Sequence, residues 1–133
     1  MNRELYITEY FMKSLVAAHL ATVVPAFLIG TWLIFFSTKG ARRHRALGAA
    51  YLALMLATAI LTFFIRELKH GALSWIHYMF IPLTLFGIWS AISGVRARNI
   101  ARHRNAMIGL YAGVVGAGVA AMLPGRFLST ILW

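Results

Sequence analysis

The chain has 133 residues, of which 61% are hydrophobic and 12% charged, whereas a soluble domain carries about 25% charged residues. This composition excludes an ordinary water-soluble globule. The absence of cysteine excludes disulfides and thiolate chemistry, and three acids beside thirteen Lys and Arg argue against a paired-carboxylate hydrolase. The positive charge sits in short clusters between long apolar runs, which favours a membrane protein over a nucleic-acid-binding one.

Four apolar runs are about as long as the roughly 20 residues that cross a bilayer as a helix. They are Leu15–Phe36, Ala46–Ile65, Ser74–Ser93 and Ala106–Leu123. The first run is too long for the apolar part of a signal peptide, so we take it as a span. Short connections make neighbouring helices antiparallel. The sequence therefore predicts an all-α integral membrane four-helix bundle, a single transmembrane domain over residues 1–133.

The distribution of basic residues predicts the orientation of this bundle. The first and third connections carry eight basic residues and no acid: Lys39, Arg42, Arg43, Arg45, Arg96, Arg98, Arg102 and Arg104. The opposite side has five basic residues and all three acids. Because short cytoplasmic loops are enriched in Lys and Arg, we expect these two connections inside and both termini outside. Contact with anionic lipid accounts for the clusters without nucleic acid.

One motif of histidine, proline, glycine and tryptophan occurs twice. The first copy is His19-x5-Pro25-x4-Gly30-x-Trp32, and the second is His77-x4-Pro82-x4-Gly87-x-Trp89. An Arg-His-Arg sequence is also repeated, around His44 and His103, with a glycine and a tyrosine after each. Corresponding histidines are 58 and 59 residues apart. The pattern predicts a duplicated helical hairpin whose copies are related by a pseudo-two-fold axis along the membrane normal.

This symmetry predicts two pairs of histidines at two depths. His19 and His77 would lie near the outer surface, and His44 and His103 near the cytoplasmic surface. Ionisable residues within spans are functional candidates, and imidazole is a good ligand for iron, including as both axial ligands of a haem. The pattern therefore favours two haem b groups, the outer one held by the first and third helices and the inner one by the second and fourth.

Other features agree with haem binding and also have simpler explanations. Four basic residues would contact haem propionates or lipid. They are Arg45 and Arg104 inside, and Arg66 and Arg126 outside. A stripe on the second helix consists of His44, Gly48, Tyr51, Met55, Thr58 and Thr62. Small residues such as Gly30 provide clearance for a porphyrin, or simply allow close helix packing. We assign no role to His70.

Two alternatives from other functional classes stay open. One is a cofactor-free accessory subunit of a larger membrane energy-transducing complex, since the chain is small and has exposed aromatic faces. The other is a proton, ion or lipid pathway that uses histidines as relays. The scarcity of carboxylates within the spans argues against coupled transport. Whether the chain is an enzyme is not decided by these patterns.

Three segments carry a resemblance to an uncharacterised bacterial family of predicted membrane proteins with four spans. They are H-R-A-L-G-A-A-Y (His44 to Tyr51), R-H-R-N-A-M-I-G-L-Y (Arg102 to Tyr111) and M-L-P-G-R (Met122 to Arg126). The likeness extends over nearly the whole chain from Leu15. It implies the fold and a multi-pass location in the bacterial inner (cytoplasmic) membrane, but no activity.

The placement of the histidines is also similar to that in the transmembrane dihaem b cytochromes of the ascorbate-dependent ferric-reductase type. That resemblance implies the pairs His19 with His77 and His44 with His103. This chain departs from the pattern of those cytochromes, which have additional flanking helices and have their ligands deeper in the spans. The implied function is electron transport across the membrane, with a quinone or another redox partner and the bilayer as partners.

Overall fold

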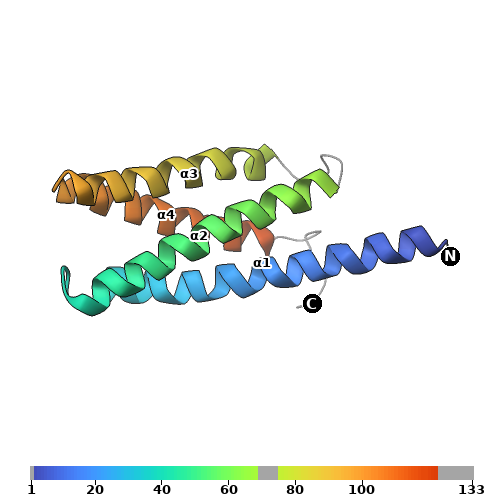
Figure 1. Cartoon of the computed structure of the whole chain (residues 1–133), viewed down its shortest axis with the longest axis horizontal. Helices are drawn as coiled ribbons and strands as arrows, with labels where there is room; N and C mark the ends of the chain where they lie inside the picture. Colours follow the sequence, from blue (N-terminus) through green and yellow to red (C-terminus); the bar gives the residue numbers. More distant parts are fainter. Residues whose placement is uncertain (1, 69–74, 123–133) are drawn as a thin grey trace.

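The computed structural model describes residues 2–68 and 75–122, which form four α-helices (Figure 1). These are α1 (Arg3–Phe35), α2 (Arg42–Leu68), α3 (Trp75–Arg96) and α4 (Ile100–Ala121). The described residues contain no strand. The prediction of an all-α four-helix fold is therefore confirmed.

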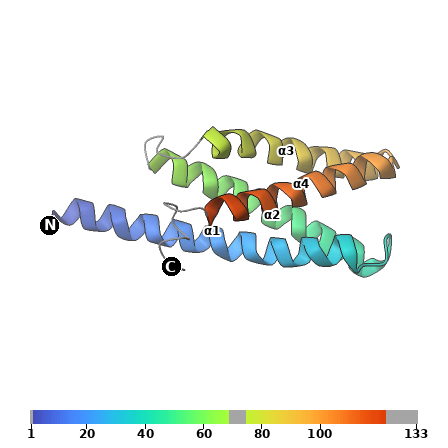
Figure 2. The same ribbon diagram turned by 180° about the vertical axis from the view of Figure 1, so that it is seen from behind.

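The helices form a bundle in which each helix has two neighbours. Helix α1 packs along α2 and α3 packs along α4, while α2 also contacts α3 and α1 contacts α4. Consequently α1 lies diagonally from α3, and α2 diagonally from α4. The α1–α2 and α3–α4 connections are at the same end of the bundle (Figures 1 and 2). This arrangement of two hairpins agrees with the predicted duplication, and it gathers the eight basic residues of the two connections at one end.

Helix α1 is longer than the span predicted for it. It begins at Arg3 rather than at Leu15, and its 33 residues correspond to about 50 Å. Its N-terminal part extends past the ends of the other helices (Figure 1). The extension contains no proline or glycine, and an ion pair one turn apart joins Lys13 to Glu9 at 3.1 Å. The apolar run indicates only the part of this helix that suits lipid, and the helix itself is longer than that run.

The surface of the bundle suits a bilayer. Large apolar side chains are exposed on all four helices, among them Leu28, Ile60, Phe86 and Val119. Three helices are long and apolar enough to cross a membrane: α1, α2 and α3. In the described part of α4, the first turns carry Arg102, His103 and Arg104, which lowers its hydropathy. The span predicted there ends at Leu123, outside the described residues, so the fourth span stays a prediction, as do the orientation and the symmetry axis.

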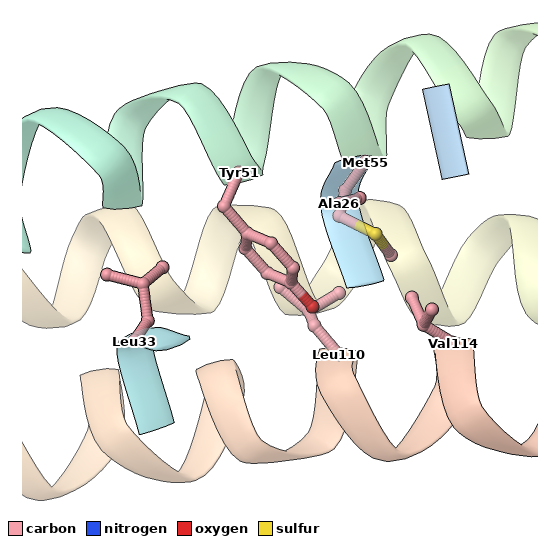
Figure 3. Close-up of a cluster of buried hydrophobic side chains, with 6 residues drawn as sticks. All are labelled: Ala26, Leu33, Tyr51, Met55, Leu110 and Val114. Carbon is pink, nitrogen blue, oxygen red and sulfur yellow. The ribbon is translucent and has the colours of Figure 1, made fainter. Parts of the chain in front are cut away.

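The packing of the core explains why two of the repeated positions, 30 and 87, are glycine. Six buried side chains form the core: Ala26, Leu33, Tyr51, Met55, Leu110 and Val114 (Figure 3). The Tyr51 ring projects from α2 between the other helices and is 1% exposed. A Cβ atom at Gly30 would be 2.9 Å from ring atoms of both Tyr51 and Tyr111, and one at Gly87 would be 2.7 Å from Leu110 Cδ2. These two glycines allow close helix packing, and the tyrosine rings beside Gly30 favour packing over clearance for a porphyrin as the role of that glycine.

A tight turn joins α3 to α4 and fixes the start of α4. Arg98 adopts a left-handed conformation with φ of 54°. The amide of Asn99 donates to the carbonyl of Gly94 at 2.8 Å, and that of Arg98 donates to Val95 at 3.1 Å. This is the Schellman pattern of a helix C-terminus. The Asn99 side chain then accepts from the amide of Arg102 at 3.1 Å and caps α4.

Candidate functional site

His44 is half-buried in the first turn of α2, and its ring is held by the C-terminus of α1. Its Nδ1 lies 2.8 Å from the hydroxyl of Ser37. That hydroxyl donates its one hydrogen to the carbonyl of Leu33 at 2.6 Å. Ser37 must therefore accept from His44, which places the proton of the neutral imidazole on Nδ1 and a lone pair on Nε2. Lys39 donates to the same hydroxyl and to the carbonyls of Leu33 and Ile34.

His103 is anchored in the same manner, by a different group. Its Nδ1 lies 3.0 Å from the backbone carbonyl of Ala91 on α3. A carbonyl only accepts, so Nδ1 carries the proton and Nε2 of the neutral ring carries a lone pair. The contact requires a close approach of α3 and α4, which Gly94 allows, because a Cβ there would lie 2.7 Å from the backbone nitrogen of His103.

His44 and His103 lie at the same end of the bundle, on the diagonally opposed helices α2 and α4. Both lie outside the apolar runs, which begin at Ala46 and Ala106. Burial lowers the pKa of His44 below its ordinary value of 6.5, and the positive charges of Lys39 and His103 lower this pKa further. The lowered pKa favours the neutral form of His44, the form in which an imidazole can bind a metal.

This lowered pKa predicts a pH dependence of stability. Because the unfolded chain binds a proton at His44 more readily, stability is fully present above about pH 6.5 and decreases as the pH falls below that value. We expect the melting temperature in detergent, followed by circular dichroism, to fall between pH 7.5 and 5.5. The fall should be smaller in His44→Gln, and equal falls in the two proteins would contradict the account.

His19 lies near the other end of the bundle in a cluster of threonines. Its Nδ1 is 3.3 Å from the hydroxyl of Thr62, which donates to the carbonyl of Thr58 at 2.8 Å. The Thr58 hydroxyl is in turn 2.9 Å from that of Thr22. The hydroxyl of Thr62 therefore accepts from Nδ1 of His19. Thr58 and Thr62 belong to the stripe predicted on α2, in which Tyr51, Met55 and Thr62 are buried.

The structure describes only some of the remaining predicted site residues. His77 lies on α3, but its side chain is outside the described residues, as is that of Arg66 on α2. Arg126 and His70 are also outside them. Arg45 and Arg104 are exposed. Among the described side chains no three His, Asp or Glu residues form a metal-binding group, but a bis-histidine haem needs only two protein ligands.

A cavity of about 800 Å³ runs along the interior faces of all four helices. At one end it is bordered by His19, Thr58 and Thr62, and at the other by Ser90 and Arg102. Its volume is in the range of about 300–1,000 Å³ that is usual for ligand pockets. From the sequence, Arg102 is one of the inner basic residues that could contact haem propionates or lipid, and Ser90 is not singled out. The spacing of 12 residues across the α3–α4 turn gave no signal that these two side chains meet.

Four packed helices with exposed apolar side chains fit a membrane protein, which agrees with the family that matches the chain. The family model described as "Predicted membrane protein (DUF2306)" matches residues 16–131. The chain belongs to this family. No curated protein and no solved structure shows a significant match. The membership agrees with the predicted resemblance to an uncharacterised four-span family and assigns no activity.

Proposed function

We propose that the chain is a transmembrane electron carrier that binds two haem b groups, each between two histidines, one near each face of the membrane. The single observation that supports this proposal best is the inner pair, His44 and His103. These two side chains come from diagonally opposed helices at the same end of the bundle, the charge of His103 lowers the pKa of His44, and both rings are held through Nδ1.

The tautomers favour ligation of a metal. Histidines that bind a metal through one ring nitrogen commonly donate the other N–H to a carbonyl or a similar group, which fixes the ring. Nδ1 of His103 donates to the Ala91 carbonyl, and Nδ1 of His44 donates to the Ser37 hydroxyl. Both rings are therefore held through Nδ1 with Nε2 as the ligand nitrogen. Exposed Arg45 and Arg104 at the same end supply cations for haem propionates.

The outer site is supported by the cavity beside His19. This end is lined by Thr58 and Thr62 and by small residues of α4, Gly113 and Ala117. On α3, position 77 precedes Phe80 and Ile81, which line the cavity, by three and four residues. Residues at this spacing share one face of a helix. The predicted pairing of His19 with His77 is therefore compatible with the register of α3.

When bound, haem supplies one-electron chemistry. The chain would hold the iron through imidazoles, orient each ring by its Nδ1 hydrogen bond, and exclude water with the core around Tyr51 and Met55. Partners under this proposal are the bilayer and a quinol or another redox partner, in the bacterial inner membrane. The membrane location itself rests on the apolar helices and the family.

Absorption spectra of the purified protein test this function. We expect a Soret band that shifts on reduction with dithionite, a decrease of about half in His103→Gly, and recovery of that loss on addition of imidazole. Arg96→Ala, which changes an exposed side chain at the same end, should leave the spectrum unchanged.

Other outcomes of this experiment favour the alternatives. Protein without any Soret band, isolated together with a large membrane complex, would favour the accessory subunit. Protein without haem that carries a flux in liposomes, lost in His19→Ala, would favour a histidine pathway. Either result would exclude the electron carrier.

A further inference from the structure

Arg102 differs from the other basic residues at its end of the bundle. Seven of these are exposed: Lys39, Arg42, Arg43, Arg45, Arg96, Arg98 and Arg104. Arg102 is half-buried and lines the cavity. Its guanidinium lies 4.6 Å from the centre of the Trp89 ring, and its Nε donates to the Ser90 hydroxyl at 3.2 Å. The stacking and the hydrogen bond hold this cation in one position.

No acidic side chain is near enough to neutralise Arg102. The three acids of the chain are Glu4, Glu9 and Glu67. Two of them are in the first turns of α1 and the third is in the last turn of α2, and both of these helix ends are opposite the end with the basic connections (Figure 1). Among the described residues, the partners of the half-buried Arg102 guanidinium are a hydroxyl and an aromatic ring, so its two terminal nitrogens can still donate. The chemistry of the site therefore calls for an anion from outside the chain.

The cavity that begins at Arg102 continues as an apolar groove toward the membrane. Its walls in this half are Leu83 and Phe86 of α3 and Ala106 and Gly109 of α4. Leu83 and Phe86 are 58% and 61% exposed although they line the cavity, so the groove is open on the lipid-facing side of the bundle. A Cβ at Gly109 would meet nothing within 4 Å, which leaves space along α4.

We infer that this groove binds one anionic phospholipid, with its phosphate at Arg102 and an acyl chain along Phe86 and Gly109. A phospholipid matches this groove in charge and in shape. Arg102 is a cation for its phosphate, Trp89 lies at the expected membrane interface, and the groove opens laterally for its acyl chain. Asn105 also lines the cavity and offers an amide donor next to the phosphate position. The inference does not depend on haem, because it uses the half of the cavity away from His19, and neither His44 nor His103 lines this cavity.

Quenching of tryptophan fluorescence tests the site directly through Trp89. The full-length protein in detergent is titrated with phosphatidylglycerol carrying brominated acyl chains, and separately with brominated phosphatidylcholine. Subtraction of the signal of Trp89→Phe isolates the response of Trp89. We expect quenching at a concentration about tenfold lower with the anionic lipid. Equal quenching by the two lipids would overturn the inference.

Two variants and one competitor identify what recognises the lipid. Arg102→Ala should abolish the preference for phosphatidylglycerol, whereas Arg96→Ala should keep it; equal behaviour of the two variants would overturn the site. Gly109→Leu should weaken binding while Arg102 is retained, and its circular dichroism should match that of the wild type. Inorganic phosphate should fail to displace the lipid at equal concentration, since displacement would indicate a site for a free anion without an acyl chain.

Discussion

Replacement of Tyr51 by alanine is expected to lower the free energy of unfolding by about 3–5 kcal/mol, the range for loss of a large buried aromatic side chain. Tyr51 is the largest fully buried side chain in the described part of the chain. Its ring contacts the position of Gly30, and its neighbours in the core are Leu110 and Met55 (Figure 3). Rigid helices cannot collapse into the space that remains, so most of this loss would persist. Titration of the purified protein with SDS in mixed micelles, followed by circular dichroism, measures the change.

Tyr51→Phe is the matched control for this substitution. The hydroxyl of Tyr51 is buried without a hydrogen-bond partner among the described residues, and a buried polar group in this state costs about 1–3 kcal/mol. Its removal should therefore leave stability unchanged or increase it by about 1 kcal/mol. A loss in Tyr51→Phe close to that in Tyr51→Ala would show that the hydroxyl has an essential partner and would contradict this description of the core.

The second large effect is expected for Gly94→Ala. A Cβ at this position would lie 2.7 Å from the backbone nitrogen of His103 and 3.1 Å from its Cα. Because both atoms belong to the main chain, α3 and α4 would have to separate rather than a side chain rotate. We expect a destabilisation of about 1–3 kcal/mol, measured by the same SDS titration. The separation should also lengthen the hydrogen bond from His103 to Ala91 and reduce haem content.

Gly48→Ala provides the comparison. This glycine is also in a helix, but a Cβ there meets nothing within 4 Å, so the substitution should be neutral or stabilising by up to about 1 kcal/mol through helix propensity. If Gly94→Ala were as stable as Gly48→Ala, the close contact between the two helices would be contradicted.

The four-helix fold could be predicted from the sequence, because helices that contact lipid must carry long apolar runs. Long apolar runs, short basic connections and a repeated motif predicted four helices in two hairpins, and the structure agrees. Helix α1 begins twelve residues before the predicted span, because a helix can continue beyond the apolar run when nothing such as proline interrupts it. Hydropathy indicates which part of a helix suits lipid, but it does not indicate where the helix itself ends.

The candidate site was predicted in part. Repetition of the Arg-His-Arg sequence predicts that His44 and His103 form a pair, and the structure places both residues at the same end of the bundle, on α2 and α4; the pairing itself stays a prediction. Hydrogen bonds to Ser37 and Ala91 could not be predicted, since they depend on how one helix end packs on its neighbour. The role of Gly30 was left open for the same reason: only the packed structure shows that tyrosine rings from α2 and α4 occupy the space beside it.

Haem content per chain is the most direct test of the central claim that these histidines act as two pairs. Haem and protein are quantified in the purified wild type, in His44→Ala, in His103→Ala and in the double variant. We predict two haems per chain in the wild type and one in each of the three variants, because both single substitutions remove the same inner site. No haem in the wild type, or a further loss in the double variant beyond either single one, would contradict the pairing.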